Sequence, residues 1–169
     1  MSEKIYNVLF LCTGNSCRSV FAECILNRLG YDRFRGYSAG SHPTGEINPY
    51  ALELLQRFDY PTDQLRSKSW DEFTGPDAPE MDFVVTVCDQ AAGEICPVWR
   101  GKPMTAYWNF PDPAKFEGTK DQTRAFFQEV YGRISHALSI FVNLPVSSLD
   151  ETVLKQKLAE IGESINENH

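Results

Sequence analysis

A cysteine and an arginine at the end of an apolar run are the residues of this chain best suited to chemistry. Cys12 closes the run, and five residues separate it from Arg18, where a helical pattern begins. A strand, a tight polar loop and a helix N-terminus in this order bind an anion, because backbone N–H groups of the loop point inward at it. Arg18 can hold two oxygens of that anion with its planar fork. The same positive field would lower the pKa of Cys12 and keep it a thiolate, so the spacing predicts attack by a thiol on a phosphate-like group.

The residues around this pair fit an anion-binding loop. Gly14 and Asn15 tolerate positive φ, and the Ser19 hydroxyl can hydrogen-bond a thiolate. Each residue alone has a plainer interpretation, because a cysteine that ends a buried strand is usually a small hydrophobe and a loop arginine is usually solvated. Their combination favours a functional loop. The oxyanion would be bound by Thr13, Gly14, Asn15, Ser16, Cys17 and Arg18.

Size and charge narrow the class of protein. The 169 residues make one domain, and the net charge of −7 argues against nucleic acid or an anionic membrane as a partner. The N-terminal apolar run is too short for a signal peptide, and no stretch is long enough to span a bilayer. We therefore expect a cytoplasmic protein. Five cysteines without paired CxxC units argue for reactive thiols over disulfides or a zinc site, so no metal ligands are assigned.

Strand-like runs alternate with helical patterns along the chain, which is typical of a parallel α/β sheet. In such a sheet, ligands bind beyond the carboxyl ends of the strands. Cys12 and Cys88 each end a predicted strand, and residues 109–113 follow the fourth, so all three are expected at one edge of the sheet. Strands are predicted over residues 6–11, 35–39, 83–87 and 104–108, and helices over 18–29, 48–58 and 121–143.

The last segment looks appended to this core. Residues 1–147 form the predicted catalytic domain, and residues 148–169 form an amphipathic helix and tail packed on it. Ser148 and Glu151 have the spacing of a capping box. An apolar stripe follows, which favours packing on the domain over an oligomer contact. The stripe consists of Leu154, Leu158, Ile161 and Ile165.

Four stretches of the sequence resemble the low-molecular-weight protein tyrosine phosphatase superfamily. They are residues 10–19, Tyr37-Ser38-Ala39-Gly40, residues 84–97 and residues 108–114. Within this superfamily the chain is most similar to the arsenate reductases of the ArsC type. The resemblance covers nearly the whole chain. It implies a doubly wound, mostly parallel four-stranded sheet with helices on both faces.

The resemblance also implies roles for single residues. Cys12 would be the nucleophile, Arg18 the oxyanion clamp and Ser19 the support of the thiolate. Asp112 would be the general acid, and Cys88 and Cys96 match relay thiols of the family. The expected activity is reduction of arsenate to arsenite through a disulfide relay, with weak aryl phosphatase activity. Thioredoxin or glutaredoxin with glutathione would supply the electrons.

A low-molecular-weight protein tyrosine phosphatase is the alternative. Such enzymes usually carry tyrosines directly after the Asp-Pro pair, whereas Ala114 and Lys115 follow it here. A phosphatase needs no second or third thiol, but arsenate must receive two electrons from thiols. Cys88 and Cys96 therefore favour the reductase. A non-catalytic oxyanion sensor would need neither Cys12 nor Asp112, and no catalytic role is assigned to Cys17 or Cys24.

A cation site is the last feature that the resemblance implies. Some relatives hold a potassium ion behind the loop with residues that match Asn15, Glu23 and Ser38. A further acidic ligand of these relatives aligns with Lys68, so the ammonium could replace the ion and pair with Glu23. No tightly bound cofactor is otherwise expected.

Overall fold

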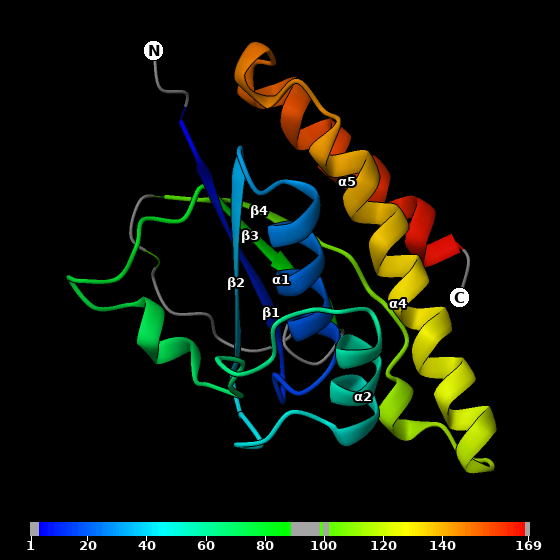
Figure 1. Ribbon diagram of the computed structural model, residues 1–169. Coiled ribbons are helices and arrows are strands. Elements are labelled where there is room, and N and C mark those ends of the chain that lie inside the picture. Colours follow the sequence, from blue (N-terminus) through cyan, green and yellow to red (C-terminus); the bar gives the residue numbers. More distant parts are fainter. Residues whose placement is uncertain (1–3, 89–98, 100–101, 168–169) are drawn as a thin grey trace.

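Four parallel strands form one sheet in the order β2-β1-β3-β4 (Figure 1). The computed structural model describes residues 4–88, 99 and 102–167. β1 lies in the middle, and its last residue, Cys12, pairs with Gly40 of β2. The predicted α/β class and parallel sheet are confirmed, and each predicted strand ends within one residue of the observed one. The strands are β1 (Tyr6–Cys12), β2 (Phe34–Gly40), β3 (Phe83–Thr86) and β4 (Met104–Tyr107).

The two faces of the sheet are covered differently. Val8 and Phe10 of β1 belong to the larger core, which includes buried residues of the α-helices, while Leu9 and Leu11 belong to a smaller cluster. This division follows from the alternation of side chains along a strand. The smaller cluster packs beneath the short turn η1 (Trp70–Phe73), which lies across the sheet from the helices (Figure 1). The helices are α1 (Arg18–Leu29), α2 (Pro49–Arg57), α4 (Lys120–Val142) and α5 (Glu151–Glu167), with the turns η2 (Pro113–Lys115) and η3 (Val146–Ser148).

Local signals set the helix ends. Gly30 closes α1 and donates its N–H to the Leu26 carbonyl at 2.8 Å. The Asn48 side chain caps α2, and a capping box at Thr119 begins α4. These boundaries agree with the predicted ones to within one residue. No helix in the described ranges is long and apolar enough to cross a membrane.

The start of α5 corrects one prediction. The Ser148–Glu151 capping box is wrong, because Ser148 lies in η3 and Glu151 is already the first helical residue. Asp150 caps the helix instead, its Oδ1 accepting from the Val153 N–H at 2.8 Å. The predicted apolar stripe packs inward, and Figure 1 shows α5 beside α4.

Candidate active site

The loop between β1 and α1 turns sharply at a buried asparagine. Asn15 has φ of 48° and no exposed surface, so its side chain must form hydrogen bonds inside the protein. Its Nδ2 donates to Ser19 Oγ at 2.8 Å, and its Oδ1 accepts from the Lys68 N–H at 2.8 Å. Gly14, which also tolerates positive φ, does not adopt it, and its missing side chain leaves room for Thr44.

A second segment of the chain holds the loop from outside. Ser41, His42 and Thr44 donate their N–H groups to the carbonyls of residues 12, 13 and 14, at 3.3, 2.9 and 3.0 Å. Asn48 does the same for the carbonyl of Ser16 at 2.9 Å. These four hydrogen bonds fix the backbone of the loop, and a loop fixed in this way can present N–H groups to an anion. The sequence gives no periodic signal for this role of residues 41–48, and it was not predicted.

Gly40 allows the loop to pack this closely. A Cβ on Gly40 would lie 2.4 Å from the Thr13 carbonyl oxygen and 3.0 Å from the Asn15 nitrogen. Both are backbone atoms that cannot rotate away. The last residue of β2 must therefore be glycine for the loop to keep this shape.

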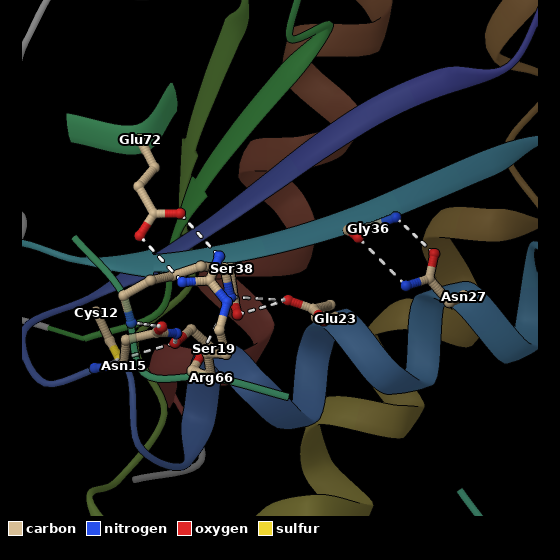
Figure 2. A network of polar contacts seen from close by, with 10 residues as sticks. Cys12, Asn15, Ser19, Glu23, Asn27, Gly36, Ser38, Arg66 and Glu72 are labelled. Atoms are coloured by element: carbon tan, nitrogen blue, oxygen red, sulfur yellow. Dashed lines mark hydrogen bonds and ion pairs between the residues drawn. The ribbon is translucent and has the colours of Figure 1, made fainter. Parts of the chain in front are cut away.

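The sulfur of Cys12 is buried and hydrogen-bonded. Only 3% of the residue is exposed, and Sγ lies 3.0 Å from Ser19 Oγ and 3.3 Å from the Asn15 nitrogen. Because Asn15 Nδ2 donates to Ser19 Oγ, the Ser19 hydroxyl hydrogen is left to point at the sulfur. Figure 2 shows these three side chains together at the end of β1. This arrangement stabilises a thiolate once one forms.

A second thiol lies beside the first. Cys88 is 1% exposed, and its Sγ lies 3.8 Å from Thr13 Oγ1. Its hydrogen bond with Cys12, followed by burial, raises the pKa of Cys12 well above its usual value, against the lowering effects of Ser19 and Arg18. The expected low pKa of Cys12 is therefore wrong for the pair of free thiols. The loop residues Ser19 and Arg18 do lower the pKa of Cys12, but Cys88, at the end of the neighbouring strand, and burial raise it more.

Arg18 reaches across to the segment after β4. Its Nη1 donates to the Phe110 carbonyl at 3.1 Å, and its Nη2 lies 3.5 Å from Asp112 Oδ2. The other carboxylate oxygen of Asp112 accepts from the Ala114 N–H at 3.0 Å. Cys12, Cys88 and residues 109–113 thus meet at one edge of the sheet, where the topology predicted them.

The remaining cysteines are placed differently. Cys96 lies outside the described residues. Burial is the main reason that the pKa of Cys17 is raised. Burial is also the main reason that the pKa of Cys24 is raised, to about 12. Both thiols therefore resist ionisation. His42 is exposed on its loop, with Nδ1 3.1 Å from Ser41 Oγ.

A partly buried carboxylate and a partly buried ammonium lie behind the loop. Glu23 Oε1 accepts from Ser38 Oγ at 2.7 Å and lies 3.7 Å from Lys68 Nζ, which also donates to the Arg66 carbonyl at 3.2 Å. The side chains of Lys68 and Glu23 are 11% and 17% exposed. Figure 2 shows the contact between Glu23 and Ser38 in the same network as Asn15. Lys68 connects the Glu23–Lys68 ion pair to the loop, because its backbone N–H donates to Asn15. Among the described residues, no three His, Cys, Asp or Glu side chains are grouped to hold a metal.

Residues 7–158 match the family model described as low molecular weight phosphotyrosine protein phosphatase. An arsenate reductase of Oceanobacillus iheyensis is 34% identical over 141 residues, which are 83% of this chain and 96% of that protein. An arsenate reductase of Bacillus subtilis is 35% identical with the same coverage.

Solved structures share the fold. One is described as an arsenate reductase in the phosphate binding state; it superposes with a TM-score of 0.65 and 22% identity over 82% of this chain and 97% of that one. A low molecular weight phosphotyrosine phosphatase from Vibrio cholerae superposes with a TM-score of 0.63 and 25% identity. The match covers 82% of this chain and 95% of that one. Both reductases and phosphatases are thus built on this framework.

Proposed function

Since the chain belongs to the low molecular weight phosphotyrosine protein phosphatase family, we propose that it reduces arsenate to arsenite with three of its own thiols. The observation that supports this most directly is the presence of two buried thiols at the loop, with Cys12 ending β1 and Cys88 Sγ 3.8 Å from Thr13 Oγ1, the residue after Cys12. A phosphatase needs only the first of these thiols, whereas a two-electron reduction needs both. The names of the relatives at 34–35% identity agree with this choice.

The first step would join arsenic to Cys12. Arsenate enters the loop, where the inward N–H groups and Arg18 neutralise its charge. The Cys12 sulfur bonds to arsenic and one arsenate oxygen leaves as water, taking the thiol proton and a further proton. Asp112, which lies beside Arg18, would deliver a proton to that oxygen. Arsenic remains pentavalent in this adduct.

The second step would transfer the electrons. Cys88 attacks the Cys12 sulfur, the sulfur–arsenic bond breaks, and its electron pair leaves with arsenic as arsenite. The two thiols are oxidised to a Cys12–Cys88 disulfide while arsenic goes from the pentavalent to the trivalent state. Cys96 would then attack Cys88, freeing Cys12 and leaving a Cys88–Cys96 disulfide. An external dithiol, from thioredoxin or from glutaredoxin with glutathione, would reduce that disulfide.

The same loop would hydrolyse aryl phosphates weakly, because phosphate and arsenate share shape and charge. Cys12 would form a thiophosphate and Asp112 would protonate the leaving oxygen. This activity needs neither Cys88 nor Cys96. A tyrosine phosphatase remains the alternative function, and Ala114 and Lys115 after the Asp-Pro pair count against it.

The decisive experiment separates the two activities. Cys88→Ser should abolish arsenate-dependent NADPH consumption with either coupled donor system and leave aryl phosphate hydrolysis in place. Cys24→Ser, which changes a buried cysteine in the middle of α1, should retain both. Arsenate turnover in Cys88→Ser would refute the relay. Peptide mass spectrometry after one turnover without reductant should show a Cys88–Cys96 linkage, and a persistent Cys12–Cys88 linkage would exclude Cys96 as the resolving thiol.

We further propose that Lys68 takes the place of a potassium ion behind the loop. Its ammonium lies between Glu23 Oε1 and the Arg66 carbonyl, and its backbone holds Asn15. A fixed positive charge there would support the loop without an added cation. Reduction by the native protein should be the same in potassium and sodium at equal ionic strength, while Lys68→Asp should require potassium. Lys155→Asp, at an exposed position of α5, is the control. Strong potassium activation of the native protein would refute the proposal.

A further inference from the structure

We propose that α5, which contributes no residue to the anion loop, positions Asp112 through the indole of Trp108. This inference rests on the proposed function only in its kinetic test. Trp108 directly follows β4, and its Nε1 donates to the Leu158 carbonyl in the middle of α5 at 3.1 Å. It is 1% exposed and is among the largest fully buried side chains in the described part of the chain. A buried side chain of this size, hydrogen-bonded at its tip, fixes the backbone that bears it.

The backbone after Trp108 leads directly to the acid. The N–H groups of Trp108 and Phe110 donate to the carbonyls of Thr86 and Val87, at 2.8 and 3.3 Å, and so extend the pairing with β3. The Phe110 carbonyl accepts from Arg18, and Asp112 comes two residues later. Any shift of α5 across the end of β4 would therefore move the segment that carries Asp112.

The contact between α5 and β4 depends on a glycine. A Cβ on Gly162 would lie 2.6 Å from the Tyr107 carbonyl oxygen and 3.2 Å from Trp108 Cδ1. Glycine in the interior of a helix lowers helix stability by about 1 kcal/mol relative to alanine. At residue 162 the close approach of β4 gives a reason for this cost. Gly162 thus lets α5 approach the residue from which the acid segment extends.

Two variants test whether α5 positions Asp112 through Trp108, and a third variant is the matched control. Trp108→Phe removes the indole N–H but keeps an aromatic ring, and in a regular helix the Leu158 carbonyl still accepts from the Gly162 N–H. Gly162→Ala places a methyl group against the Tyr107 carbonyl. Gly132→Ala makes the same change in α4, where a Cβ would meet nothing within 4 Å. Thermal unfolding of each variant shows whether it folds.

The first readout is a single arsenate turnover without reductant. A misplaced acid slows the chemical step more than it weakens binding, so Trp108→Phe and Gly162→Ala should slow arsenite release about tenfold. The arsenate concentration for half-maximal rate should change by less than about twofold, because the loop still binds the oxyanion. Gly132→Ala should react as the native protein does.

The second readout needs no turnover. The Ala114 N–H donates to Asp112 Oδ1, so its amide resonance in a ¹H–¹⁵N spectrum reports the position of the carboxylate. That resonance should move in Trp108→Phe and Gly162→Ala and stay in place in Gly132→Ala. An unmoved resonance in both folded variants would overturn the positioning role, as would native single-turnover rates. A native protein that reduces no arsenate would instead refute the proposed function, and the Ala114 resonance would still decide the role of α5.

Discussion

The loop that carries the proposed nucleophile Cys12 and the acid segment, which carries the proposed general acid Asp112, are held in place in different ways. Four loop carbonyls are bound by backbone N–H groups of residues 41–48, and Cys12 is 3% exposed. The side chain of Asp112 is 24% exposed; it lies next to the Arg18 guanidinium and accepts a hydrogen bond from the Ala114 N–H. An anion site must keep many dipoles aligned at once, so the backbone itself forms it. A proton donor needs only one carboxyl group at the right place, and a few side-chain contacts suffice.

The same contrast applies to what can move. The segment that carries the acid is anchored before Asp112 by the buried residues Trp108 and Phe110. Arg18 belongs to the loop and also binds this segment. An oxyanion that attracts the Arg18 guanidinium would therefore compete with the Phe110 carbonyl and with Asp112. Anion binding in the loop would in this way be coupled to the acid segment.

The largest effects are expected in the loop. Cys12→Ser should lower both arsenate reduction and aryl phosphate hydrolysis by more than about a thousandfold, because an alcohol is not ionised there. Arg18→Lys should also be severe, since an ammonium cannot reproduce the planar fork. Steady-state assays of both reactions measure these losses. Substantial activity of Cys12→Ser would refute every step proposed for this site.

A smaller effect is expected in the acid segment. Asp112→Asn keeps the shape of the side chain but cannot donate the proton, and general acids contribute about a hundredfold or more. Hydrolysis of aryl phosphates with poor leaving groups should fall by about that factor, and good leaving groups should be affected less. Asp121→Asn, at a side chain that is 98% exposed, is the control. Equal losses for both kinds of leaving group would show that Asp112 supports the structure only.

The free energy of unfolding should distinguish a substitution beside the loop, at Gly40, from one at an uncrowded position, at Gly75. Gly40→Ala forces a methyl group against the Thr13 carbonyl, and such overpacking costs about 2 kcal/mol of the free energy of unfolding. Gly75→Ala adds the same methyl group where nothing lies within 4 Å, so its unfolding should be nearly unchanged. Urea unfolding of the two variants measures the difference. Equal stability would mean that the loop adapts and that its shape is not fixed from outside.

Sequence reasoning succeeded where a local pattern carries the structure. Helix α1 runs from Arg18 to Leu29 as predicted, because an apolar stripe and a closing glycine define it. The parallel sheet followed from alternating strand and helix patterns, and its topology brought Cys12 and Cys88 together. Cys12 and Arg18 could be assigned to one loop from the sequence because only five residues separate them.

It failed where contacts join residues far apart in the chain. Residues 41–48 and the Lys68 backbone hold the loop, yet no pattern within these segments indicates it. The bond from Trp108 to Leu158 spans 50 residues and was likewise not predicted. The pKa of Cys12 was wrong for the same reason, since its main cause is Cys88 on the neighbouring strand end.

That cause leads to the last prediction, which concerns the pKa of Cys12. Its hydrogen bond with Cys88 is the largest factor that raises this pKa, so Cys88→Ala should lower it. Alanine is chosen because a serine hydroxyl could still form a hydrogen bond. The fraction of Cys12 present as thiolate at neutral pH should rise, since an acid with a lower pKa is more ionised at a given pH. Alkylation by iodoacetamide should then be faster, with its pH midpoint moved toward lower pH.

A matched variant shows whether the effect is specific to Cys88. Cys17 lies inside the loop and is equally buried, but it is not among the causes that act on the Cys12 pKa, so Cys17→Ala should leave the midpoint in place. Burial continues to raise the pKa in Cys88→Ala, while Ser19 and Arg18 continue to lower it. An unchanged or higher midpoint in Cys88→Ala would mean that the loop alone sets the ionisation of Cys12. A lower midpoint would mean that the second thiol restrains the first until an oxyanion enters, which couples the start of the reaction to the group proposed to complete it.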